Sequence, residues 1–112
     1  VLRLRGGGVQ EIEDVDELKS ILQKHKDSLI VLDIHASWCG PCKVMSREGG
    51  TLDAFQQISD VPLVKINVDQ EREIATKYDV RGIPCFIYFE NGIAKARATG
   101  VQSLQQLKNL TK

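Results

Sequence analysis

Hydrophobic positions along the chain follow two periods, one typical of strands and one typical of helices. A nearly continuous apolar run at 29–34, rich in branched side chains, predicts a central strand covered on both faces. Residues 62–68 predict a second buried strand, and residues 85–89 predict a third strand. Residues 8–12 predict a short edge strand. Asn91-Gly92 favours a hairpin turn with positive φ angles, so we expect residues 93–99 to return beside the strand at 85–89.

Apolar residues spaced by three and four positions predict helices. Asp14, with Glu17 three residues later, is expected to cap the first helix. Its apolar face consists of Val15, Leu18, Ile21 and Leu22. Asp69 is expected to cap a short helix that runs to about Tyr78. A last helix is expected to carry one apolar stripe: Val101, Leu104, Leu107 and Leu110.

The helix after the first buried strand is expected to begin at Gly40-Pro41, because proline fits a first helical turn, where its missing N–H is harmless. Gly49-Gly50 interrupts this helix, and each interior glycine costs about 1 kcal/mol relative to alanine. We expect a break or bend there, followed by a second segment through Leu52, Phe55 and Ile58. The predicted order is β-α-β-α-β-α-β-β-α, an α/β fold with a mixed sheet between helices.

Length and charge narrow the class of protein. The chain has 112 residues, enough for one domain, and 42% of them are hydrophobic. Its 15 basic and 15 acidic side chains leave no net charge to attract nucleic acid or an anionic membrane, so we expect neither partner. The longest apolar run falls far short of the roughly 20 residues that cross a bilayer. No secretion signal opens the chain, so we expect a reducing compartment, the cytoplasm. We also expect a monomer.

The first seven residues, Val-Leu-Arg-Leu-Arg-Gly-Gly, alternate apolar and basic side chains before a glycine run. They resemble the C-terminal tail of ubiquitin, which ends in Leu-Arg-Leu-Arg-Gly-Gly. The resemblance implies a junction, either a natural ubiquitin fusion or an engineered remnant, where a ubiquitin-processing protease would cut after Gly7. A strand or linker with chance similarity is the alternative. We assign residues 1–7 to this extension and 8–112 to the folded domain.

A pair of cysteines carries the chemistry that the sequence suggests. Three cysteines are too few for a secreted disulfide framework, but Cys39 and Cys42 stand two residues apart where a strand passes into a helix. This spacing permits reversible disulfide closure. Cys39 would lie at the helix N-terminus, where backbone N–H groups and the helix dipole stabilise the nucleophilic thiolate. Cys42, one turn further in and more buried, would resolve the mixed disulfide that Cys39 forms.

Two other interpretations of the pair are open. Half of a structural zinc site would need further ligands, for which the candidates are Cys85, His35 and His25, and these do not form a second close pair. We therefore expect no metal. The cysteines could also be buried and inert, but Trp38 and Gly40-Pro41 around them are typical of an exposed turn.

The chain from about Gly8 onward resembles the thioredoxin family. The resemblance rests on several motifs along the chain: Trp38-Cys39-Gly40-Pro41-Cys42, Asp33, Lys65, Gly82-Ile83-Pro84, Asn91-Gly92 and Gly100. It implies the thioredoxin fold. It also implies a buried carboxylate, Asp33, beneath the resolving cysteine, and a neighbouring ammonium group, Lys65.

Physical chemistry gives Asp33 and Lys65 a role of their own. Burial should raise the pKa of Asp33 and Lys65 should oppose that rise, so Asp33 is expected to exchange protons near neutral pH. Our hypothesis is that Asp33 takes the proton of Cys42 when Cys42 attacks. A structural ion pair without proton transfer is the alternative.

The resemblance also implies a surface that holds substrate. A cis Ile83-Pro84 bond would leave the N–H and carbonyl of Ile83 free to pair with an extended substrate strand. Trp38, with Gly40 and Pro41, would contact the partner beside the nucleophile. The alternatives are a plain turn proline at Pro84 and a Trp38 that caps the core.

Three positions depart from the family pattern. Arg47 stands where thioredoxins commonly have a helix-kinking proline, and Gly49-Gly50 could supply the bend instead. His35 stands at a usually aromatic position, either as a hydrogen-bonded core residue or as a titrating neighbour that modulates the active site. Cys85 replaces a usual threonine, either as a small buried residue or as a third redox-active thiol near the pair.

These features predict a protein-disulfide reductase. The resemblance implies disulfide-containing protein substrates, no bound cofactor, and reduction by a thioredoxin reductase-like flavoenzyme that uses NADPH. Gly40-Pro41 resembles reducing thioredoxins, so we expect a potential near about −270 mV. A thioredoxin-like binding module is an alternative, but it would not require the cysteines, Asp33, Lys65 and Pro84 together. A disulfide oxidase or isomerase, which tends to carry histidine between the cysteines, is another.

Overall fold

The computed structural model describes residues 9–24 and 29–112, so the predicted extension at 1–7 lies outside the described residues. It contains five strands: β1 (Val9–Ile12), β2 (Leu29–His35), β3 (Leu63–Asn67), β4 (Cys85–Glu90) and β5 (Ile93–Thr99). It contains five helices: α1 (Val15–Lys24), α2 (Gly40–Ser46), α3 (Thr51–Ile58), α4 (Glu73–Lys77) and α5 (Leu104–Leu110). The α/β fold and the order of its elements are those predicted, with the second helix divided into α2 and α3.

The strands form one mixed sheet in the order β1-β3-β2-β4-β5. Strands β1 and β2 each pair in parallel with β3, while β4 is antiparallel to both β2 and β5. The β4–β5 hairpin turns at Asn91 and Gly92, with φ angles of 55° and 79°, as the Asn-Gly sequence predicted. Strand β2 is the middle strand of this order, which explains its nearly continuous apolar run.

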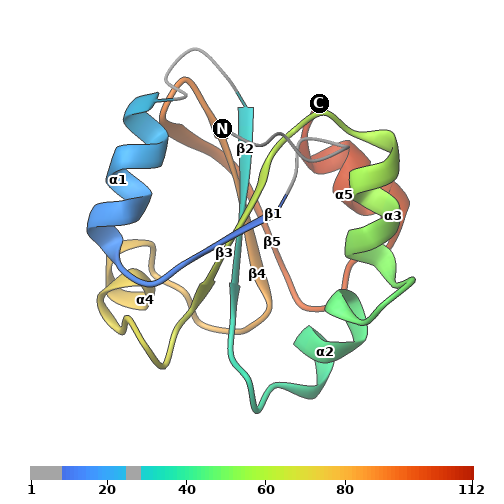
Figure 1. Ribbon diagram of the computed structural model, residues 1–112, viewed down its shortest axis with the longest axis horizontal. Coiled ribbons are helices and arrows are strands. Elements are labelled where there is room, and N and C mark those ends of the chain that lie inside the picture. The colour runs from blue at the N-terminus through green and yellow to red at the C-terminus, as the bar shows by residue number, and fades with distance from the viewer. Residues whose placement is uncertain (1–8, 25–28) are drawn as a thin grey trace.

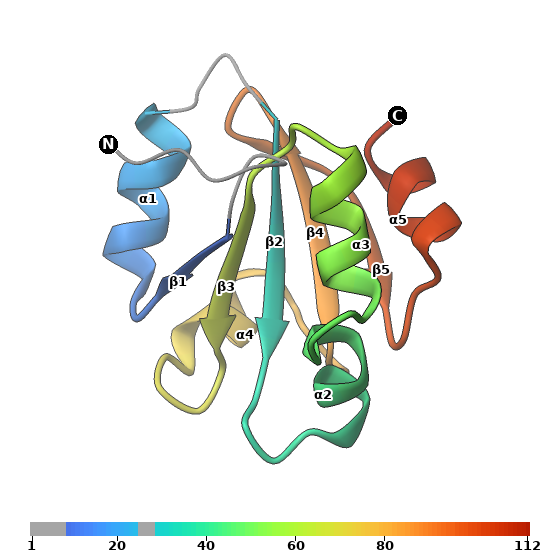
Figure 2. The same ribbon diagram turned by 45° about the vertical axis from the view of Figure 1, so that its right-hand side comes forward.

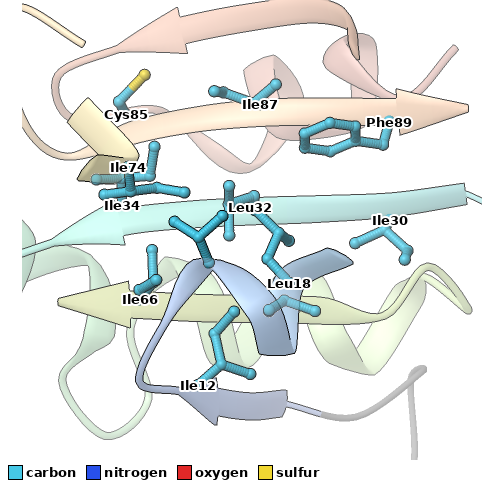
Figure 3. Close-up of a cluster of buried hydrophobic side chains, with 12 residues drawn as sticks. Ile12, Leu18, Ile30, Leu32, Ile34, Ile66, Ile74, Cys85, Ile87 and Phe89 are labelled. Atoms are coloured by element: carbon cyan, nitrogen blue, oxygen red, sulfur yellow. The ribbon is translucent and has the colours of Figure 1, made fainter. Parts of the chain in front are cut away.

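Helices cover both faces of the sheet (Figure 1), α1 and α4 on one side and α2, α3 and α5 on the other. Strand β2 serves both layers, because successive side chains point to opposite faces. Ile30, Leu32 and Ile34 join the core cluster beneath α1 and α4, which Figure 3 shows. Val31 joins Met45 of α2 and other residues in the opposite cluster.

The chain breaks between α2 and α3 for reasons that two glycines explain. Gly49 has φ +75°, which side chains other than glycine rarely adopt. A Cβ on Gly50 would lie 2.9 Å from the carbonyl oxygen of Arg47, so no larger residue fits without a shift. Asp53 Oδ2 accepts a 2.7 Å hydrogen bond from the N–H of Gly49. The predicted interruption is confirmed, and it is a full break rather than a bend.

Two predicted helix boundaries are wrong. Helix α4 begins at Glu73, not beyond an Asp69 cap, and its N-cap residue Arg72 makes no side-chain capping bond. The carboxylate of Asp69 instead accepts a hydrogen bond from the indole of Trp38. Val101 lies outside α5 and is exposed, because the helix begins after Ser103, which forms a capping box with Gln106. In the described residues, none of the helices is long and apolar enough to cross a membrane.

Candidate active site at the end of strand β2

The two close cysteines form a disulfide at the start of α2. Figure 2 shows the loop after β2 leading directly into this helix. Cys39 is the N-cap residue, and its Sγ accepts a 3.1 Å hydrogen bond from the N–H of Cys42. The Cα atoms of Cys39 and Cys42 are 5.3 Å apart. Pro41 occupies the first turn, as predicted. The helix start thus holds the two sulfur atoms within bonding reach.

The burial of the two cysteines differs from the expectation. Cys39 is 3% exposed and Cys42 is 5% exposed, so the prediction that Cys42 is the more buried was wrong for this disulfide-bonded form. The reason is a small cluster in which both cysteines pack with Ala36 and in which Val68 and Ile83 cover them. What distinguishes the two cysteines is therefore their position on the helix rather than their exposure.

Trp38 lies on the surface beside the disulfide. Its side chain is 66% exposed, which rules out the interpretation that it caps the core. Its Nε1–H donates a 2.6 Å hydrogen bond to Oδ2 of Asp69, whose own N–H donates to Oδ1 of Asn67. Asp69 was missed as a site residue. The signal for it was that β2 and β3 run in parallel, so the residues that follow them meet at one edge of the sheet.

The segment before β4 contributes the other side of the site. The Ile83-Pro84 bond is cis, as predicted, and the side chain of Ile83 packs against the disulfide cluster. The carbonyl of Pro84 accepts a 2.8 Å hydrogen bond from the N–H of Gly100. Within the described part of the chain, the N–H and carbonyl of Ile83 have no hydrogen-bond partner.

Asp33 lies on the face of the sheet that α2 covers. Its register partner on β4 is Phe86, which packs with Met45 one helical turn beyond Cys42. Asp33 is 2% exposed, and its Oδ1 has no hydrogen-bond partner in the part of the chain that the structure describes. Burial raises the pKa of Asp33 to about 6, opposed chiefly by the positive charge of Lys65.

Lys65 acts on Asp33 through space rather than by direct contact. The two residues are register partners on β3 and β2. The ion pairs among residues 9–24 and 29–112 are His35–Glu11 and Arg81–Asp79, so Lys65 and Asp33 do not form the close ion pair that one interpretation of the sequence required. Asp33 is thus a buried carboxyl group, and the positive charge of Lys65 only partly offsets the rise in its pKa that burial causes.

His35 and Cys85 lie on different faces of the sheet. The imidazole Nε2 of His35 is 3.1 Å from Oε2 of Glu11 on β1, a partner that sequence reasoning missed. Cys85 is a buried free thiol in the cluster beneath α1 and α4, on the face opposite Asp33. Burial raises the pKa of Cys85, although a hydrogen bond with Thr99 and the charge of Arg97 oppose the rise.

No group of three or more His, Cys, Asp or Glu side chains among the described residues is placed to hold a metal ion. His25, one of the candidate zinc ligands, lies outside those residues.

The fold and the cysteine pair define a class of protein, the thiol-disulfide oxidoreductases that carry two cysteines at a helix start. Comparison with known proteins identifies the family within that class. The family model described as Thioredoxin matches residues 9–112. The chain belongs to the thioredoxin family, and it is a dithiol-disulfide reductase that acts through Cys39 and Cys42.

Individual relatives agree with this assignment. A thioredoxin of Mycoplasma genitalium is 39% identical over 92 residues, which cover 82% of this chain and 86% of that protein. Thioredoxin-1 of Schizosaccharomyces pombe is 38% identical over 88 residues, which cover 75% of this chain and 78% of that protein. The crystal structure of Schistosoma mansoni thioredoxin matches with a TM-score of 0.81 at 31% identity, covering 95% of this chain and 94% of the other.

Proposed function

We propose that Cys39 is the nucleophile and Cys42 the resolving thiol in the reduction of protein disulfides. In the first step the Cys39 thiolate attacks a substrate disulfide, forming a mixed disulfide and releasing one substrate sulfur as thiolate. In the second step the Cys42 thiolate attacks Cys39 Sγ, which forms the Cys39–Cys42 bond and releases the second substrate sulfur. Two electrons pass to the substrate. The observation that carries the assignment is the hydrogen bond from the N–H of Cys42 to Cys39 Sγ, a contact that would stabilise a thiolate there.

The substrate segment would lie between Trp38 and Ile83. The N–H and carbonyl of Ile83 are free to pair with an extended strand, and the exposed indole of Trp38 offers a flat apolar surface on the other side. Gly40 and Pro41 would form the floor between them. A Cβ on Gly40 would have no neighbour within 4 Å, so the space next to Gly40 is open for a substrate. Recognition through backbone groups would allow many protein disulfides to bind.

Asp33 would accept the proton of Cys42 before the second step. The buried carboxylate lies on the face of the sheet that α2 covers, and its pKa of about 6 is high enough for proton exchange near neutral pH. The positive charge of Lys65 would lower the pKa of Asp33, so that a sufficient fraction of Asp33 is ionised and can act as a base.

Recycling completes the proposed cycle. The oxidised pair would be reduced by a flavoenzyme of the thioredoxin reductase type with electrons from NADPH, and the domain itself would bind no cofactor. We place this activity in the cytoplasm, where the redox poise keeps such a pair reduced, and we propose a monomer with a potential near about −270 mV.

We also propose that the folded domain comprises residues 8–112, and that residues 1–7 are a ubiquitin-type junction that a ubiquitin-processing protease cuts after Gly7. Such a protease, offered the chain fused behind complete ubiquitin, should leave a product that begins at Gly8.

Two measurements test the roles of the cysteines. Equilibration with glutathione buffers gives the potential of the pair, and a value above about −200 mV would identify an oxidase or isomerase instead. Cys42→Ser should trap a stable mixed disulfide with a substrate protein, whereas Cys39→Ser should trap none. The reverse pattern would overturn the assignment. Cys85→Ser is the matched control, because its thiol lies in the other core cluster and should not change trapping.

A further inference from the structure

Three charged side chains form one row across three neighbouring strands. Glu11 on β1 is the register partner of Lys65 on β3, and Lys65 is the register partner of Asp33 on β2. Register partners in a parallel sheet point to the same face, so negative, positive and negative charges alternate along the row. His35 lies two residues beyond Asp33 and therefore shares its face of β2.

Glu11 and His35 close this arrangement. Their strands are not neighbours, because β3 lies between them, and yet Oε2 of Glu11 and Nε2 of His35 are 3.1 Å apart. The two side chains therefore reach toward each other across β3. The side chain of Glu11 is 50% exposed and that of His35 only 16%, while Asp33 is 2% exposed. The pair thus lies nearer to solvent than Asp33.

Direct contacts do little to determine whether Asp33 is protonated or ionised. One carboxylate oxygen has no hydrogen-bond partner in the described residues, and Lys65 forms no close ion pair with it. Burial has the largest influence on how readily Asp33 ionises, and charges that do not touch it adjust that balance. Besides Lys65, the charges that act on it are those of His35, which lowers the pKa of Asp33, and Glu11, which raises it.

We propose that the Glu11–His35 pair adjusts the proton affinity of Asp33, with His35 as a positioning residue that offsets the negative charge of Glu11. The imidazole lies against the Glu11 carboxylate, so it offsets a negative charge that would otherwise favour the protonated form of Asp33. Without the imidazole, Glu11 would oppose the positive charge of Lys65 more strongly. The proposal rests on the proposed role of Asp33, because the consequence for catalysis is that His35 tunes the transfer of the Cys42 proton to Asp33.

The direct test is an NMR titration of the Asp33 carboxyl carbon in the oxidised protein, in which Cys39 and Cys42 do not titrate. His35→Gln should raise the Asp33 midpoint by about half a pH unit, a size typical of a screened charge at short range. Adding Glu11→Gln to His35→Gln should bring the midpoint back down. Glu73→Gln, on α4 at the other face of the sheet, is the matched control and should leave the midpoint unchanged.

A second readout connects the midpoint to the reaction. The pH dependence of mixed-disulfide release should shift in His35→Gln in the same direction as the midpoint. An unchanged Asp33 midpoint in His35→Gln, with or without loss of stability, would overturn the proposal and leave the pair a structural contact. Asp33→Asn separates the role of Asp33 as base from the electrostatic coupling. If Asp33→Asn releases substrate as fast as the parent protein, the role of Asp33 as base fails. A shifted Asp33 midpoint in His35→Gln would still support the coupling.

Discussion

The indole N–H of Trp38 donates a 2.6 Å hydrogen bond to the carboxylate of Asp69, which joins the residue before the nucleophile to the segment after β3. Trp38 is otherwise largely exposed, so this bond is what holds the ring beside the disulfide. A second bond, from the N–H of Asp69 to the side chain of Asn67, fixes the carboxylate in turn. The orientation of the proposed docking surface therefore depends on a residue outside the cysteine pair and its helix.

Asp69→Ala should weaken substrate binding without slowing the exchange chemistry. Loss of a hydrogen bond to a charged acceptor costs about 1.5–3 kcal/mol at most, and here only the part that orients Trp38 reaches the substrate, so we expect KM to rise about threefold to tenfold. The chain has one tryptophan, so its fluorescence and indole N–H resonance report the change directly. Asp69→Asn, which keeps an acceptor oxygen, should retain most of the binding. A fall in kcat with unchanged KM would contradict this role.

Asp33 should make the protein less stable as pH rises. Its folded pKa of about 6 exceeds the ordinary pKa of 3.8 for an aspartic acid side chain, so between these values the native state holds a proton that the unfolded state has released. The free energy of unfolding therefore falls as pH rises through this window, and the loss, about 3 kcal/mol in total, persists above it. In Asp33→Asn this loss is absent. The stability difference between the variant and the parent protein should thus grow from near zero at about pH 3 to about 3 kcal/mol at about pH 7.5.

Urea unfolding of both oxidised proteins across this range checks the prediction. Titrating groups far from Asp33 are common to the two proteins and cancel in the difference, whereas Lys65, His35 and Glu11 interact with Asp33 and contribute to it. A difference that stays constant with pH would mean that Asp33 keeps an ordinary pKa in the folded state.

Most of the fold could be predicted because its signals are local. The central strand β2 is a long apolar run, the Asn91-Gly92 turn favours positive φ angles, and two successive glycines, Gly49-Gly50, disfavour a continuous helix. The positions of Cys39 and Pro41 at the start of α2 follow from the same local rules. These elements place the redox pair before any long-range contact is known.

The parts that failed depend on partners distant in sequence. Aspartate is a common helix-capping residue, but the carboxylate of Asp69 accepts a hydrogen bond from Trp38, which precedes it by 31 residues. Glu11 finds His35 only through the register of three strands, and this register is not visible in a linear sequence. The burial of Cys39 comes from Val68 and Ile83, which later segments bring over it.

Gly50→Ala should destabilise the protein through lack of space. The φ of Gly50 is −81°, an ordinary value, but the added Cβ would lie 2.9 Å from the carbonyl oxygen of Arg47 and 3.1 Å from that of Met45. Backbone atoms yield less readily than side chains, so we expect a loss of about 1–3 kcal/mol in urea unfolding. Gly40→Ala is the matched control, since its Cβ would meet nothing within 4 Å. Equal stabilities of the two variants would contradict the steric explanation.

Cys85 should react with alkylating reagents far more slowly than Cys39 in the reduced, folded protein. Its side chain is buried beneath α1 and α4, and burial raises the pKa of its thiol, so the reactive thiolate is scarce and poorly accessible. Mass spectrometry after a short exposure to iodoacetamide near neutral pH should find Cys39 modified and Cys85 unmodified, while the urea-unfolded protein should lose this difference. Cys85→Ser should then leave the potential of the pair unchanged. Rapid native alkylation of Cys85, or a potential that moves in Cys85→Ser, would instead make the third thiol part of the redox chemistry.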